Sequence, residues 1–143
     1  MAISSFTAHF VQEKQMKMFA ETQQSKGVVT YKAPEYLRWE YVSPQPLVWE
    51  LDGDKGNMNR QLKGLVMLIR QSISGDFADA EKDFDISLEG DIVTLTPKKR
   101  ETKRLFTEIR ITLNPNTQIA DRVEMTEANG DKTVITFSKV LMF

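Results

Sequence analysis

Apolar and polar residues alternate with a period of two along most of this 143-residue chain. The pattern begins with Phe6, Ala8 and Phe10, which are separated by Thr7 and His9. A period of two places one set of side chains on one face of a β-strand, so the sequence predicts strands with one apolar face. The apolar members of the later alternating segments are Val29 and Tyr31; Leu37, Trp39 and Tyr41; Leu47, Trp49 and Leu51; Phe84, Ile86 and Leu88; Val93 and Leu95; Ile109, Ile111 and Leu113; Val123 and Met125; and Ile135 and Phe137.

Turn-forming residues separate these segments. They include Asp52-Gly53, Glu89-Gly90-Asp91 and Asn129-Gly130-Asp131, of which the Asn-Gly pair is a strong hairpin signal. About ten strands joined by short connections favour an antiparallel sheet over alternating βαβ units. We therefore expect a mainly β fold with little helix, in a single domain over residues 1–143.

One segment has helical periodicity instead. The apolar residues of its stripe are Leu62, Leu65, Val66, Ile69 and Ile73. Met67 and Leu68 widen this stripe beyond what one packed face needs. The pattern predicts a helix over 62–73 that either covers an apolar hollow or is an ordinary core helix.

The areas of these elements restrict the architecture. Ten strands present roughly 1,200 Å² of apolar face, whereas a helix of this length shields roughly 180 Å². Because one helix cannot cover such a sheet, the sheet must either curl into a barrel or split into a sandwich. A barrel interior of this size holds packed side chains or a small apolar ligand.

Composition excludes several classes of function. The sequence has no Cys and one His, so a thiol or serine catalytic group and a zinc site of the usual ligands lack their residues. Nineteen Lys and Arg against twenty Asp and Glu give a net charge of −1, which favours no nucleic-acid partner. The longest apolar run, Leu65–Ile69, is far shorter than a membrane-spanning helix. We expect no catalytic residues, no metal and no cofactor.

Three charged segments have simple interpretations. The stretch from Asp52 to Asn57 resembles a calcium loop, but Lys63 stands where such a loop needs an acidic ligand, so we interpret it as a turn. The acidic residues Asp76, Asp79, Glu81, Asp83 and Asp85 are interpreted as a solvated loop. The basic cluster consists of Lys98, Lys99, Arg100, Lys103 and Arg104. This cluster is either a solvated connection or a docking patch for an acidic partner or anionic headgroups.

An ordered set of short segments resembles the LolA family of periplasmic lipoprotein carriers. The set combines an F-x-A-x-F-x-Q segment, a Gly, a Lys-x-Pro and an L-R-W-x-Y segment, and it covers the first sixty residues best. The matching segments are Ser5–Gln12, Ser25-Lys26-Gly27, Lys32-Ala33-Pro34, Leu37–Tyr41, Pro44 and Asp52-Gly53.

This resemblance implies an unclosed, strongly curved antiparallel β half-barrel of about ten strands with a helical lid over an apolar cavity. It also implies a monomeric, non-enzymatic protein of the periplasm that carries acylated lipoproteins or a related lipid. Such carriers accept their cargo from an inner-membrane lipoprotein-releasing complex and deliver it to an outer-membrane receptor. A lipid-binding receptor or sensor on the same fold is the alternative.

The chain also departs from the family pattern. The resemblance implies that it is trimmed at both ends and that the signal peptide is not part of the sequence. Ala33 stands where well-known carriers have an Arg that holds the lid closed.

The expected lipid-binding residues come from the inward faces of the first four strands and from the predicted helix. They are Phe6, Phe10, Val29, Tyr31, Leu37, Trp39, Tyr41, Trp49, Leu51, Leu65, Leu68 and Ile69.

Overall fold

The computed structural model describes residues 5–19, 21–32, 36–52, 55–56, 80–116 and 120–142. Within them, ten strands form one antiparallel sheet, as the alternation predicts. The strands are β1 (Ser5–Gln15), β2 (Thr22–Lys32), β3 (Tyr36–Ser43), β4 (Leu47–Asp52), β5 (Lys55–Gly56), β6 (Phe84–Glu89), β7 (Ile92–Pro97), β8 (Phe106–Leu113), β9 (Ala120–Glu127) and β10 (Lys132–Met142). The helical segments of the described residues are η1 (Ala80–Lys82) and α2 (Arg100–Lys103).

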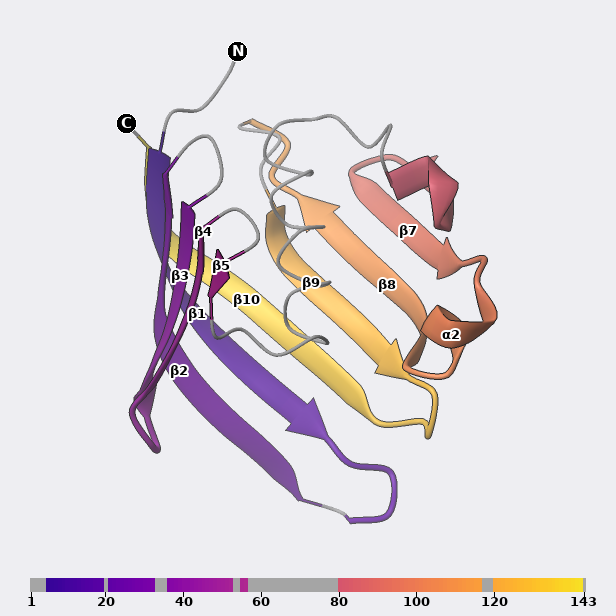
Figure 1. Cartoon of the computed structure of the whole chain (residues 1–143), viewed down its shortest axis with the longest axis horizontal. Coiled ribbons are helices and arrows are strands. Elements are labelled where there is room, and N and C mark those ends of the chain that lie inside the picture. Colours follow the sequence, from indigo (N-terminus) through magenta and orange to yellow (C-terminus); the bar gives the residue numbers. More distant parts are fainter. Residues whose placement is uncertain are drawn as a thin grey trace.

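The sheet consists of two meanders joined through the first and last strands of the chain. Its order is β5-β4-β3-β2-β1-β10-β9-β8-β7-β6, so β1 pairs with both β2 and β10. Every other neighbouring pair is consecutive in sequence, which is the consequence of short connections. Because β5 and β6 are at opposite ends of this order, the sheet is not closed (Figure 1).

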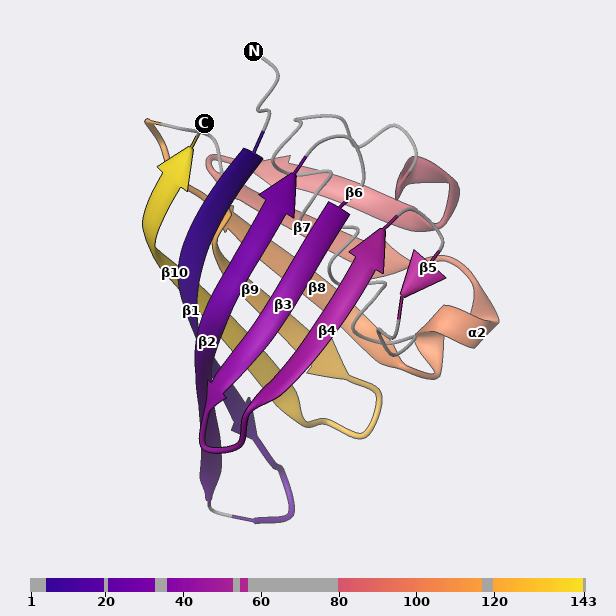
Figure 2. The same cartoon turned by 60° about the vertical axis from the view of Figure 1, so that its left-hand side comes forward.

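The two meanders face each other across the core. In Figure 2, β1–β4 lie in front of β7–β9. One cluster of buried side chains includes Phe10 and Trp39 from the first meander and Ile109, Ile111 and Ile135 from the second. Side chains of both meanders therefore contribute to one shared core. Strong curvature, an apolar cavity and a lid are not established by this arrangement and remain predictions.

Two of the predicted turns, at 89–91 and 129–131, form as expected, and the turn predicted at Asp52-Gly53 extends outside the described residues. In the β9–β10 turn, the Asp131 backbone N–H donates to Asn129 Oδ1 at 2.9 Å, and Gly130 has a φ of 95°. Gly90, in the β6–β7 turn, has a φ of 61°. Residues other than glycine rarely adopt such angles, which explains the glycine in both turns.

Two residues of the alternating pattern differ from their neighbours. Leu47 is 48% exposed and Leu88 is 68% exposed, although both fit the period of two. Leu47 opens β4 and Leu88 lies one residue before the end of β6. The pattern identifies the face of a strand but does not show how much of that face is covered, and both residues lie at or near the end of a strand.

The predicted helix over 62–73 lies outside the described residues, as do the lid residues Leu65, Leu68 and Ile69. The same holds for Ala33.

Gly27 is the point of closest approach between two strands and an aromatic ring. Gly27 is the register partner of Phe10 on β1 and of Tyr41 on β3. A Cβ atom at this position would overlap the backbone oxygen of Glu40 and come within 2.6 Å of the Phe10 ring. The missing side chain thus leaves the space that the ring of Phe10 occupies.

We expect Gly27→Ala to lower the free energy of unfolding by about 3 kcal/mol, because the added methyl group overlaps backbone that cannot move away. Gly90→Ala is the matched control, since its Cβ would meet nothing within 4 Å. Its positive φ alone should cost about 1 kcal/mol. Urea denaturation of the three proteins measures both effects, and an equal loss in the two variants would contradict the close-approach explanation.

Candidate functional site

The inward faces of β1–β4 form three parallel rows of side chains. Register pairing places Trp39 opposite Val29 on one side and Trp49 on the other, so both tryptophans lie on the same face. The rows, each written from β1 to β4, are Phe6, Tyr31, Leu37 and Leu51; Ala8, Val29, Trp39 and Trp49; and Phe10, Gly27, Tyr41 and Leu47. The residues expected from the strand pattern therefore share one continuous surface.

This surface belongs to the core of the molecule. Phe6, Phe10, Val29, Tyr31, Leu37, Trp39 and Leu51 are buried, whereas Tyr41 and Trp49 are partly buried. Most of them join the same cluster as the inward residues of β7–β10. The structure thus brings these nine expected residues together as packed side chains, and their lipid-binding role remains a prediction.

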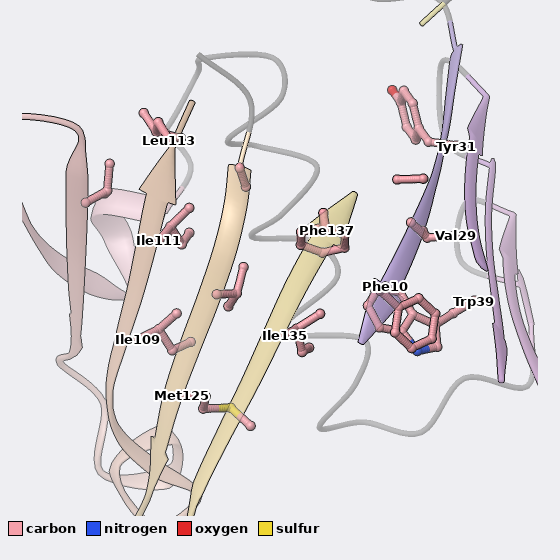
Figure 3. Close-up of a cluster of buried hydrophobic side chains, with 14 of the residues drawn as sticks. Phe10, Val29, Tyr31, Trp39, Ile109, Ile111, Leu113, Met125, Ile135 and Phe137 are labelled. Carbon is pink, nitrogen blue, oxygen red and sulfur yellow. The ribbon is translucent and has the colours of Figure 1, made fainter. Parts of the chain in front are cut away.

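An aromatic cluster occupies the centre of this face. The rings of Phe10 and Trp39 stack with their centroids 4.2 Å apart (Figure 3). Tyr41 meets Phe10 edge-on at 5.5 Å, and Phe137 of β10 meets Trp39 edge-on at 6.3 Å. These contacts join strands from both meanders, and such ring pairs add stabilisation beyond their buried area.

Polar groups border the aromatic cluster on one side. The Tyr41 hydroxyl donates a hydrogen bond to Gln12 Oε1 at 2.9 Å. Trp39 Nε1 is buried, and it is the one buried side-chain polar atom of the described residues without a hydrogen-bond partner. Gln12 was not expected here, although it lies two residues after Phe10 and so continues the inward series of β1. Its spacing of two residues from Phe10 was the signal available in the sequence.

Burial also changes the acidity of Tyr41. Removal from water raises the pKa of its phenol above the ordinary value, because the phenolate loses solvation. The nearby Trp39 indole and the Gln12 side chain oppose this rise. The indole N–H is thus close enough to favour the phenolate, although it makes no well-formed hydrogen bond.

The acidic and basic segments meet on the outside of the molecule. Lys99 Nζ lies 2.7 Å from Asp83 Oδ1, and Lys98 Nζ lies 3.8 Å from Asp85 Oδ1. The hydrogen bond to Asp83 raises the pKa of Lys99. The two segments that the sequence analysis treated separately therefore compensate each other, which leaves the exposed Arg100, Lys103 and Arg104 on and after α2.

In the described ranges, no group of three or more His, Cys, Asp or Glu side chains could hold a metal ion. None of the helices described is long and apolar enough to cross a membrane.

Comparison with a family model gives a match over residues 1–142. That family is described as "Outer membrane lipoprotein carrier protein LolA". No curated protein matches the sequence significantly.

Solved structures share the fold at low identity. A crystal structure of MucB matches with a TM-score of 0.58 and 13% identity, over 96% of this chain and 53% of MucB. The complex of Pseudomonas aeruginosa MucA and MucB matches with a TM-score of 0.57 and 12% identity, over 96% of this chain and 51% of the matched chain. A LolA superfamily protein from Nitrosomonas europaea matches with a TM-score of 0.51 and 11% identity, over 100% of this chain and 88% of the matched chain. The chain spans about half the length of the MucB structures, and at these identities the likeness concerns the fold alone.

The raised pKa of Tyr41 predicts a loss of stability at alkaline pH. Its neutral form contributes fully below the ordinary tyrosine pKa of about 10, and the contribution is lost as the pH rises through the higher folded value. We expect Tyr41→Phe to lose less stability than the wild-type protein between pH 8 and pH 11, measured by guanidinium unfolding. Phenolate absorbance is the second readout. The difference between the wild-type protein and Tyr41→Phe isolates the Tyr41 phenol from that of Tyr36, whose pKa is also raised, and this late-titrating difference must disappear after unfolding. A Tyr41 that titrates at its ordinary pKa would contradict this prediction.

Proposed function

The chain belongs to the LolA family, and from that membership we propose that it is a periplasmic carrier of acylated lipoproteins or a related lipid. In this proposal it shields the acyl chains of its cargo from water and shuttles the cargo from the inner to the outer membrane. Proteins of this family are typically periplasmic, and its carriers are not enzymes.

The observation that carries the proposal is the three-row inward face of β1–β4. Its side chains are aliphatic and aromatic along four adjacent strands, which is the surface that a methylene chain requires. Each buried methylene contributes about 0.8 kcal/mol, so partial shielding of one chain already retains a lipid in water. Retention without strong polar contacts also permits release, which a shuttle needs.

Access to this face requires that something moves, because its residues are packed in the structure. We propose that the predicted helix over 62–73 is a lid and that strong curvature of the sheet provides an apolar cavity beneath it. In this proposal, Leu65, Leu68 and Ile69 contact the open side of the half-barrel through apolar contacts. Weakly held elements of this kind open locally without global unfolding.

A regulatory module that binds lipid without transporting it is the second candidate. The likeness to MucB favours it, because one matching structure is a complex of MucB with MucA. The two candidates differ in transfer. A carrier moves a lipoprotein from donor vesicles to acceptor vesicles, whereas a sensor binds the lipid and retains it.

The first prediction from this proposal concerns the inward face. We expect Leu37→Glu to weaken binding of a fluorescent fatty-acid probe by about tenfold or more, because a carboxylate then lies against the acyl chain. Val42→Glu is the matched control on the same strand, since Val42 is exposed and points to the opposite face.

Folding of each variant is checked by circular dichroism, and Trp49→Glu tests the half-buried end of the central row. Probe binding that is equal in Leu37→Glu, Trp49→Glu and Val42→Glu would contradict the location of the site. Absence of binding to the wild-type protein would contradict the proposed function.

The second prediction concerns the proposed lid. Hydrogen exchange of residues 62–73 should be faster than that of β3 and β8 in the lipid-free protein, and it should slow when lipid is added. Protection equal to that of the strands without lipid would make 62–73 a static core helix and would remove the lid from the mechanism.

A further inference from the structure

The inward face contains one polar group that its own packing leaves unused. Trp39 has no exposed surface, and its Nε1–H has no partner in hydrogen-bond geometry. The nearby Tyr41 hydroxyl oxygen receives only an electrostatic influence that opposes the rise of the Tyr41 pKa. Buried donors in folded proteins are paired in the great majority of cases, because a lone buried donor has lost its hydrogen bond to water. An unpaired donor at this position needs an explanation.

The rings around Trp39 determine the side from which a partner can arrive. Phe10 covers a face of the indole at 4.2 Å, and Phe137 stands perpendicular to it at 6.3 Å. Figure 3 shows the indole nitrogen at the edge of the stacked pair rather than between the rings. A partner atom therefore reaches Nε1 in the plane of the indole, beside Tyr41.

The neighbouring groups are polar, uncharged and only partly buried. The Tyr41 hydroxyl donates to Gln12 Oε1 at 2.9 Å, which leaves the lone pairs of the hydroxyl oxygen near the indole. Tyr41 and Gln12 are both partly exposed, so the polar side of the cluster borders solvent while Trp39 lies behind it. The next inward residue of β1, Lys14, is engaged by Glu127 at 3.7 Å.

These contacts select a particular kind of ligand atom. A donor in an uncharged, largely apolar setting suits a neutral acceptor, because a carboxylate would pay a large desolvation cost there. The apolar rows beside the donor suit a methylene chain. A carbonyl oxygen at the head of an acyl chain combines both features.

We propose that the Trp39 indole N–H, beside Tyr41 and Gln12, binds the carbonyl oxygen of an ester- or amide-linked acyl chain. This inference rests on the proposed acyl-binding function and adds the chemistry that positions the chain. The hydrogen bond fixes the head of the chain at the polar side of the cluster, so the tail extends along the rows toward Leu37 and Leu51. Ether-linked chains and plain hydrocarbons lack this acceptor.

The test compares two lipids that differ in one carbonyl group. Monopalmitoyl glycerol carries the ester carbonyl, and hexadecyl glycerol ether does not. We expect the wild-type protein to bind the ester about three- to tenfold more tightly, the effect of one neutral hydrogen bond. Trp39→Phe should abolish this preference, because it keeps an aromatic ring and removes the N–H. Trp49→Phe is the matched control and should retain the ester-to-ether ratio, whatever its effect on overall affinity.

A second measurement leaves Trp39 in place and so does not depend on how the Trp39→Phe protein folds. In Trp49→Phe, Trp39 provides the one remaining indole N–H signal in a ¹⁵N-correlated NMR spectrum. The ester should shift this proton downfield and slow its exchange with water, and the ether should do neither.

The outcomes separate this site from the function on which it rests. Equal affinity for the two lipids, or equal indole shifts, overturns the carbonyl site and leaves acyl binding intact; a buried water on Nε1 would give this result. A preference that persists in Trp39→Phe assigns the carbonyl to another donor and also overturns the site. Failure of both lipids to bind overturns the acyl-binding function together with the site.

Discussion

The ring of Phe10 lying over Gly27 is the contact on which the arrangement of this face depends. The contact exists because β1, β2 and β3 pair in a register that places Phe10, Gly27 and Tyr41 in one row. The ring then extends across the glycine and stacks on Trp39, two residues along β3. Trp39 in turn meets Phe137 of β10, so a single missing side chain on β2 allows the two meanders to share one aromatic cluster. A one-residue slip of β2 would place Lys26 or Val28 under the ring and would turn the inward residues of β2 outward.

In the proposed carrier, the same face would both stabilise the lipid-free protein and receive a ligand, and these two demands compete. In the structure its residues are buried in the same cluster as the inward residues of β7–β10, and this burial of apolar surface stabilises the fold. A bound acyl chain replaces part of these contacts with contacts of similar kind, so the net gain is smaller than the buried area of the chain suggests. This competition keeps affinity moderate. A carrier must give up its cargo, and a face that repacks on itself after release assists that step.

The local pattern predicted the strands well because strand alternation depends on the burial of one face alone. Val29, Trp39 and Ile135 are all buried as the period of two requires. The pattern could not predict that Leu47 and Leu88 are exposed, since exposure near a strand end depends on the tertiary structure around it. Likewise, Asp83 and Lys99 are sixteen positions apart, and their pairing depends on β6 and β7 being neighbours. Trp39 and Tyr41 were expected on the inward face, but their meeting with Gln12 depends on how β1 and β3 flank β2. Long-range pairing of this kind leaves no trace in a short window of sequence.

In the proposed carrier, the distribution of charge would separate two kinds of contact. The inward face is apolar, and Tyr41 and Gln12 at its border are uncharged, so the proposed acyl binding there would be governed by apolar area and single hydrogen bonds and would depend little on salt. On the outside, Asp83 and Asp85 neutralise Lys99 and Lys98, whereas Arg100, Lys103 and Arg104 remain exposed around α2. Exposed charges act over about 8 Å at physiological salt and mainly change the rate and orientation of encounter. In the proposed carrier, docking of a partner and retention of an acyl chain would thus depend on different interactions at different places. A change in surface charge would therefore alter the docking of a partner without altering the packing of Phe10, Gly27 and Trp39, which shapes the proposed acyl-binding face.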